Sequence, residues 1–172
     1  PQMVKWNLAR FAETLLPLLG KNKGEAMEMA QKALSNFSKL YHCNWFSGMM
    51  AKLGLMDQRE GDKEIISGLL KLMEKYEADF TNTFRALTYN EFEGTDFFKN
   101  EDVALWYDNW KQRIEVQDGN HLKLMIKSNP TVIPRNHRAE KALKAVVDEG
   151  DYSVMENLLK VLKFPYTRTP EQ

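Results

Sequence analysis

The chain of 172 residues carries 24 basic and 24 acidic side chains. Proteins dedicated to binding nucleic acids or membrane surfaces normally carry a basic excess, so this balance argues against both classes. No apolar run approaches the roughly 18 residues that a membrane-spanning helix needs. Hydrophobic residues make up 43% of the chain and charged residues 28%, as in globular proteins, and we expect a single helical domain over residues 1–172.

The first third of the chain has the apolar spacing of helices. The first stripe keeps the helical period up to Leu16, and we expect Pro17 and Gly20 to end that helix. A second helix is predicted over residues 25–41. A shorter one is predicted over residues 44–55, where Gly54 suits a left-handed C-terminal cap.

The middle of the chain keeps the helical period, with one irregular stretch. Asp62 fits the N-cap of the next helix, and Asp79 fits the start of the one after it, because a carboxylate accepts the free N–H groups of a first turn. Residues 89–100 predict a loop or short turns. The helical period returns over residues 101–116.

Two prolines shape the segment NPTVIPRNHR, residues 129–138. Pro130 and Pro134 push the residues before them toward extended backbone, so we expect no helix there. Asn136 fits the N-cap of a following helix, Gly150 breaks the chain before a last helix, and residues 164–172 form an irregular tail. No stretch of four or more residues alternates as a β-strand does, so the predicted fold class is all-α.

The same segment places basic residues around a predicted helix start. Arg135, His137 and Arg138 there are candidates for an anion site on electrostatic grounds. The alternative is a stiff connector between helices, in which Arg135 and Asn136 make structural hydrogen bonds. The prolines favour the connector. Whether the three basic residues bind an anion stays open at this point.

Other patterns that carry chemistry are incomplete. GKNKGE, residues 20–25, has neither GxxxxGK nor GxGxxG spacing and predicts a solvated loop. ADF at residues 78–80 lacks the glycine and the catalytic loop of kinases, and a helix start at Asp79 explains it better. The histidines show no zinc-ligand spacing: His42, His121 and His137.

The single cysteine, Cys43, excludes an internal disulfide and a multi-thiolate metal site. It favours a reducing compartment, and we expect a cytoplasmic protein. A thiol nucleophile paired with His42 is disfavoured, because neighbours on a helix point about 100° apart. We expect a buried cysteine that acts as a small hydrophobe. The loop acids lack the pattern of a calcium loop and are expected to be solvated: Glu91, Glu93 and Asp96.

Four tryptophans could stack nucleic-acid bases in principle: Trp6, Trp45, Trp106 and Trp110. Such a platform pairs its aromatic rings with a basic groove. Trp106 and Trp110 instead share an apolar helical face with Val103 and Ile114, which favours packing in the core.

Several longer motifs, in order along the chain, carry a family resemblance. They are the start PQMVKWNLARFAETLLPLL, then MMAKLGL, LLKLMEKYEADFTNTFRAL and a W…W…R spacing, and the end NPTVIPRNHRAEKALKAVVDEGDYSVMENLLKVLKFPY. Together they resemble the C-terminal region of the selenoprotein O (SelO) family, over essentially the whole chain. The resemblance implies most of a protein-kinase-like C-lobe plus family-specific C-terminal helices.

The resemblance also implies an activity that this chain does not complete. Members of that family bind ATP in an inverted pose and transfer AMP to hydroxyl side chains of proteins, with Mg²⁺. Their nucleotide-binding, general-base and metal-binding residues lie upstream of a QP dipeptide whose proline matches Pro1. No catalytic, cofactor-binding or metal-binding residue is therefore carried over to this chain, and Cys43 does not match the cysteine- or selenocysteine-containing tail of some members.

Two hypotheses of different classes follow. The first is a C-terminal part of a protein adenylyltransferase, inactive alone, whose partners are the missing N-terminal part and the protein substrates. The second is an autonomous helical interaction module without catalysis. The chain opens within a helical pattern and without an initiator methionine, so we expect a piece of a longer protein. We also expect an exposed apolar patch where the missing part packs.

Overall fold

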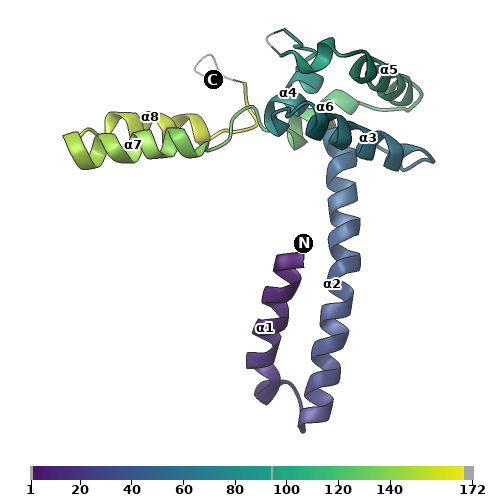
Figure 1. The fold of residues 1–172 in the computed structure, drawn as a ribbon, viewed down its shortest axis with the longest axis vertical. Coiled ribbons are helices and arrows are strands. Elements are labelled where there is room, and N and C mark those ends of the chain that lie inside the picture. Colours follow the sequence, from purple (N-terminus) through teal and green to yellow (C-terminus); the bar gives the residue numbers. More distant parts are fainter. Residues whose placement is uncertain (1, 94, 169–172) are drawn as a thin grey trace. The chain divides into compact units, whose positions relative to one another are not determined.

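The computed structural model describes residues 2–93 and 95–168, and within these residues every regular element is a helix (Figure 1). The elements are α1 (Gln2–Leu19), α2 (Lys23–Lys52), α3 (Asp62–Lys75), α4 (Phe80–Tyr89), the short 3₁₀ helix η1 (Phe97–Lys99), α5 (Glu101–Glu115), α6 (His121–Ser128), α7 (Asn136–Glu149) and α8 (Ser153–Leu162). The predicted all-α class is confirmed. None of the helices in the described part of the chain is long and apolar enough to cross a membrane.

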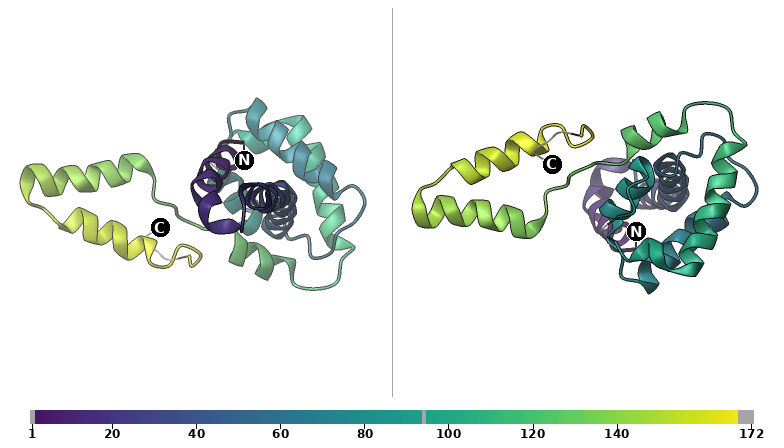
Figure 2. Two further views of the ribbon diagram at one scale, coloured as in Figure 1. Left: turned by 90° about the horizontal axis from the view of Figure 1, so that it is seen from below. Right: turned by 90° about the horizontal axis from the view of Figure 1, so that it is seen from above.

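The chain divides into two compact units, Pro1–Gly48 and Met49–Gln172. The prediction of one domain over residues 1–172 stays a prediction. In the first unit, α1 and the N-terminal part of α2 run antiparallel, side by side (Figures 1 and 2). Asn22 caps the start of α2 just before Lys23. Its Oδ1 accepts the Glu25 N–H at 2.9 Å, and the Glu25 carboxylate accepts the Lys21 N–H at 3.0 Å.

Two predicted helix boundaries in this part of the chain are wrong, at Pro17 and between residues 41 and 44. Helix α1 continues past Pro17, since a proline in the last turn removes only one backbone donor, and ends at Leu19, directly before Gly20 as predicted. The two helices predicted over residues 25–41 and 44–55 form the single helix α2. No proline or glycine separates them, and the Asn44 side chain donates to the Leu40 carbonyl at 2.9 Å along the helix instead of capping a new one.

The core of the second unit lies where α3, α4, α5 and α6 gather around the C-terminal end of α2 (Figure 2). Trp106 and Trp110 stack on α5 with ring centroids 6.0 Å apart, and both are buried. Their indole N–H groups donate to the Ile65 carbonyl at 2.8 Å and the Leu53 carbonyl at 2.9 Å. Core packing of these two tryptophans is confirmed, while Trp6 and Trp45 are exposed.

Several boundaries of the second unit differ from expectation. Asp62 is the first residue of α3 rather than its N-cap, a position that Gly61 takes with φ of 90°. Asn136 is likewise the first residue of α7, after Arg135 as N-cap. Helix α6 was not predicted, because only Met125 of its eight residues is buried and one residue makes no periodic stripe. Three other predictions are confirmed among the described residues: the helix start at Asp79, the irregular stretch over residues 89–100 and the left-handed Gly54.

Helices α7 and α8 form an antiparallel hairpin (Figure 1). Gly150 ends α7 with φ of 67°, and the Asp151 N–H returns to the Ala145 carbonyl at 3.1 Å, which confirms the predicted break. The tail after α8 is irregular through residue 168, and the rest of that prediction lies outside the described residues.

Candidate functional site

The segment NPTVIPRNHR begins at a buried asparagine that joins three helices. Asn129 is 1% exposed, and its amide donates to the Lys52 carbonyl at 2.7 Å and to the Thr88 hydroxyl at 2.9 Å. The Lys52 ammonium in turn donates to the Ser128 carbonyl at 2.9 Å, and burial lowers the pKa of Lys52. The ends of α2, α4 and α6 are thus held together where the segment starts.

The middle of the segment is fixed to the chain that follows α8. The Thr131 N–H donates to the Pro165 carbonyl at 2.7 Å, and the Thr131 hydroxyl donates to the same oxygen at 2.9 Å. The two ends of the α7–α8 hairpin are therefore tied to one another at its base. This is the geometry of a rigid corner, as the two prolines predict.

The end of the segment is held by an arginine–carboxylate pair. Arg135 Nη1 and Nη2 donate to Asp79 Oδ2 at 2.5 Å and Oδ1 at 2.9 Å, and the Asn82 N–H donates to Asp79 Oδ1 at 2.8 Å. The hydrogen bonds from Arg135, and then from the Asn82 N–H, hold the pKa of the Asp79 carboxyl below its ordinary value. Hydrogen bonding to Asp79 raises the pKa of Arg135. Arg135 is thus engaged structurally, as the connector hypothesis expects. The Asn136 side chain makes no hydrogen bond with any described residue, so its predicted structural hydrogen bond is absent from this part of the chain.

A groove of about 730 Å³ opens between α4 and the α7–α8 hairpin, beside this corner, and we call it the basic groove. Its basic lining comes from two helices and the corner: Arg85, Arg135, His137, Arg138 and Lys141. Its apolar lining includes residues of α8 and of the corner: Val132, Ile133, Val154, Leu158, Val161 and Leu162. Arg135, His137 and Arg138, which the sequence suggested as an anion site, are therefore brought together on one surface.

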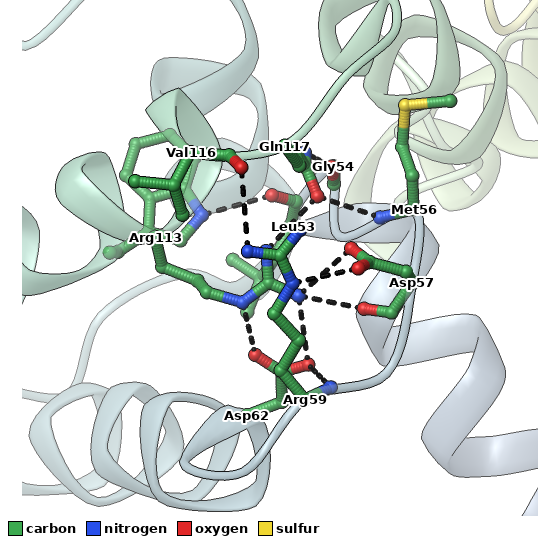
Figure 3. A network of polar contacts seen from close by, with 10 residues as sticks. Leu53, Gly54, Met56, Asp57, Arg59, Asp62, Arg113, Val116 and Gln117 are labelled. Atoms are coloured by element: carbon green, nitrogen blue, oxygen red, sulfur yellow. Dashed lines mark hydrogen bonds and ion pairs between the residues drawn. The ribbon is translucent and has the colours of Figure 1, made fainter.

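A second polar centre lies in the core and joins α5 to the loop between α2 and α3 (Figure 3). Arg113 Nε donates to Asp62 Oδ1 at 2.7 Å, and its Nη2 reaches Asp62 Oδ2 at 3.1 Å and the Asp57 carbonyl at 2.7 Å. Asp62 is fully buried and Arg113 is 9% exposed. Burial by itself lowers the pKa of Arg113, but the hydrogen bonds and charges of Asp62 and Asp57 raise it above its ordinary value. Arg113 therefore stays a cation.

Gln117, which follows the C-terminal end of α5, completes this network. Its Nε2 donates to the Gly54 carbonyl at 2.6 Å, and its Oε1 accepts the Met56 N–H at 3.1 Å and Arg113 Nη1 at 3.2 Å (Figure 3). Among the described residues, every buried side-chain nitrogen or oxygen has a hydrogen-bond partner. The network uses its polar atoms to fix the loop, which is a structural role.

The sequence did not single out Arg113 as a buried ion-pair residue. The signal that could have found it is its place on an apolar stripe: Arg113 follows Trp106 by seven residues and Trp110 by three, on the buried face of α5. A charge on such a face needs a buried partner, and Asp62 provides it.

The other residues that the sequence analysis considered for catalysis or metal binding do not gather into one site. Cys43 is exposed on α2, so its predicted burial is wrong, and the neighbouring His42 is exposed too. Glu91 pairs with Arg168 at 2.7 Å and Asp96 with Lys99 at 2.6 Å. Over residues 2–93 and 95–168, no group of three or more His, Cys, Asp or Glu could hold a metal ion.

An apolar groove of about 460 Å³ lies between α1 and α2 in the first unit, and all of its lining residues are apolar. Those from α1 are Leu8, Phe11, Ala12, Leu15 and Leu19, and those from α2 are Met29, Ala30, Ala33, Leu34, Phe37 and Leu40. Phe11 is 60% exposed, and no described residue of α1 is buried. The expected exposed apolar surface is present here.

Comparison with known proteins gives consistent matches over this chain. A sequence model of the family described as "Protein adenylyltransferase SelO" matches residues 1–163. Proteins named "Protein nucleotidyltransferase YdiU" from Brevibacillus brevis, Alkaliphilus metalliredigens and Geobacillus kaustophilus are 51%, 52% and 50% identical to it. In each case the match covers 100% of this chain and 36% of the relative, so the chain spans about a third of the length of these relatives.

Proposed function

Because the chain belongs to the SelO family of protein adenylyltransferases, we propose that it forms a helical supporting part of an enzyme that transfers AMP from ATP to Ser, Thr or Tyr hydroxyls of proteins. One observation carries the proposal: relatives named as protein nucleotidyltransferases match the whole chain at about half identity, while the chain spans 36% of their length. Its role in the intact enzyme is to support the catalytic cleft, and its location is the cytoplasm.

The groups that handle ATP and Mg²⁺ belong, in this proposal, to the part of the protein that precedes residue 1. Transfer of a phosphoryl-type group requires positioned metal ions and a clamp for the phosphates. The arginine at the corner and the arginine of the core network are engaged otherwise, since Arg135 pairs with Asp79 and Arg113 pairs with Asp62. We therefore assign no catalytic, cofactor-binding or metal-binding residue to residues 1–172.

The apolar groove between α1 and α2 is where we propose that the remainder of the polypeptide packs. Exposed apolar grooves are costly in water, and burial of such a surface is the main force that joins protein parts. The relatives supply an occupant, because about two-thirds of their length lies outside the match. Without it, the large side chains of α1 stay exposed, as Phe11 does at 60%.

This packing is tested by expressing residues 1–172 together with the remainder of the protein as two separate chains. The chains should co-purify, and Phe11→Asp, which places a charge in the groove, should abolish co-purification. Leu18→Asp is the matched control, since Leu18 lies on the same helix, is 82% exposed and does not line the groove. Equal co-purification of the wild-type and Phe11→Asp chains would show that the groove is not the contact.

The nucleotide assignment is tested by calorimetric titration with ATP and Mg²⁺. The intact protein should bind, and residues 1–172, checked by circular dichroism to be helical, should show no binding tighter than about 1 mM. Micromolar binding by residues 1–172 would place a nucleotide site in this chain and overturn the assignment.

A further inference from the structure

The basic groove gathers several cationic side chains on one surface. Its lining holds Arg85, Arg135, Arg138 and Lys141, with His137, and no Asp or Glu among the described residues that line it. The chain as a whole carries equal numbers of acidic and basic side chains, so this surface departs from the average. An excess of one charge sign in a groove attracts partners of the opposite sign.

Three of these cations are free to meet a partner. Arg135 is held by Asp79, whereas the side chains of Arg85, Arg138 and Lys141 make no hydrogen bond or ion pair with any described residue. Arg85 is only half-exposed, on α4, and the other two lie on successive turns of α7. Carboxylates of a bound chain could pair with all three from within one groove.

The apolar part of the lining decides between a simple anion and a larger ligand. Val154, Leu158 and Leu162 of α8 line the groove together with Val132 and Ile133 of the corner. A phosphate or nucleic-acid backbone leaves such a surface uncovered, while a segment that carries both acidic and apolar side chains covers it and meets the cations.

We propose that the basic groove docks an acidic, amphipathic segment of the proteins that the intact enzyme modifies. The identity of the partner as a protein substrate rests on the proposed function, whereas the charge and shape of the groove do not. Docking at this place holds a substrate protein against the enzyme without contacting the reacting hydroxyl. It therefore lowers KM and leaves kcat unchanged.

Binding is measured first, on the intact protein and without ATP, by fluorescence anisotropy of a labelled peptide of about 14 residues with Glu and Leu at helical spacing. We expect binding that weakens about tenfold or more in the Arg138→Glu/Lys141→Glu variant. Lys144→Glu is the matched control, because Lys144 is exposed on the same helix and does not line the groove. This control should leave the affinity within about twofold of wild type.

Two companion ligands separate the alternatives. A peptide with Gly in place of Leu should bind about tenfold more weakly or worse, since it cannot cover the apolar lining. A single-stranded oligonucleotide should fail to compete at equal concentration. Each of four results would overturn the proposal. The Gly peptide could bind as tightly as the Leu peptide, or the oligonucleotide could compete with it. The Lys144→Glu variant could lose as much affinity as Arg138→Glu/Lys141→Glu, or the Leu peptide could show no binding up to about 1 mM.

AMP transfer is measured second, to a hydroxyl-bearing acceptor peptide with and without the Glu–Leu segment fused to it. The segment should lower KM about tenfold in the wild-type enzyme and have no effect in Arg138→Glu/Lys141→Glu, with kcat equal in both. If the Glu–Leu peptide binds as expected but AMP is transferred to neither acceptor, the proposed function is wrong, while binding of an acidic, amphipathic segment in the basic groove is supported. If AMP is transferred but the fused segment leaves KM unchanged, the proposed docking in the basic groove is wrong, while the proposed function is supported.

Discussion

Arg135 donates two parallel hydrogen bonds to Asp79, and this pair links the N-terminal end of α7 to the N-terminal end of α4. Asp79 has a second task, because the same carboxylate accepts the Asn82 N–H and caps α4. One side chain therefore fixes both a helix start and the attachment of the corner. This answers the question that the sequence left open for Arg135, whose positive charge is already matched by a neighbouring acid.

Substitutions at Asp79 should distinguish its contribution as a helix cap from its contribution as the ion-pair partner of Arg135. Asp79→Ala removes the cap and the ion pair, and we expect the free energy of unfolding to fall by about 1–2 kcal/mol, measured by urea denaturation. Asp79→Asn keeps a capping oxygen and should lose about 0.5–1 kcal/mol, a small value because both side chains of the pair are about a third exposed. Asp108→Ala, at an exposed position of α5, is the control and should change stability by less than about 0.5 kcal/mol. Equal losses in Asp79→Ala and Asp79→Asn would show that the cap contributes nothing.

The stability that Asp79 contributes should depend on pH. Its folded-state pKa lies below the value in the unfolded chain, about 3.9, so the contribution is complete above that pH and is lost as the pH falls through the folded-state pKa. The difference in unfolding free energy between wild type and Asp79→Asn should therefore be constant near about pH 7 and shrink below about pH 4. Denaturation curves of the two proteins across this range test the sign, which a difference that grows on acidification would contradict.

Breaking the buried network should cost far more than breaking the corner pair. Arg113→Met leaves the fully buried Asp62 carboxylate without its counter-charge, and we expect a loss of about 3–5 kcal/mol. Arg113→Met combined with Asp62→Leu should lose less than Arg113→Met alone, because no unpaired charge remains in the core. A double-mutant cycle by urea denaturation measures this coupling. A double mutant whose loss equals the sum of the two single losses would show that the residues do not interact.

Two left-handed glycines offer a matched comparison of backbone strain and crowding. At Gly150, φ is 67° and a Cβ would lie in open space, so Gly150→Ala should cost about 1 kcal/mol from strain alone. At Gly54, φ is 72° and a Cβ would lie 3.0 Å from the Met125 side chain, so Gly54→Ala should cost about 2–4 kcal/mol. Equal losses in thermal or urea denaturation would mean that Met125 moves aside freely.

The sequence predicted the features that depend on local chemistry. The helical class, the cap at Asp79, the left-handed Gly54 and the buried Trp106 and Trp110 all follow from residue type and spacing over a few positions. At one helix boundary that failed, a tertiary contact competes with the local chemistry. Asp62 has the chemistry of an N-cap, but its carboxylate is drawn instead to Arg113, 51 residues away.

The basic groove could be predicted only in part. Arg135, His137 and Arg138 are neighbours in sequence, and their gathering at a helix start was visible there. Arg85 joins them from α4 and the apolar residues join them from α8, across separations that no local pattern records. Within the groove, Arg135 is paired with Asp79, whereas Arg138 is unpaired among the described residues. Which arginine is paired depends on where Asp79 lies in the fold, and the local sequence does not show this.

We propose above that residues 1–172 support an adenylyltransferase whose chemistry lies in the rest of the protein. The most direct measurement is transfer of radiolabelled AMP from ATP, with Mg²⁺, to a hydroxyl-bearing protein by three samples: the intact protein, residues 1–172 alone, and residues 1–172 co-expressed with the separately encoded remainder. We expect transfer by the first and third samples and none by the second. Transfer by residues 1–172 alone, or an intact protein that transfers no AMP, would contradict it.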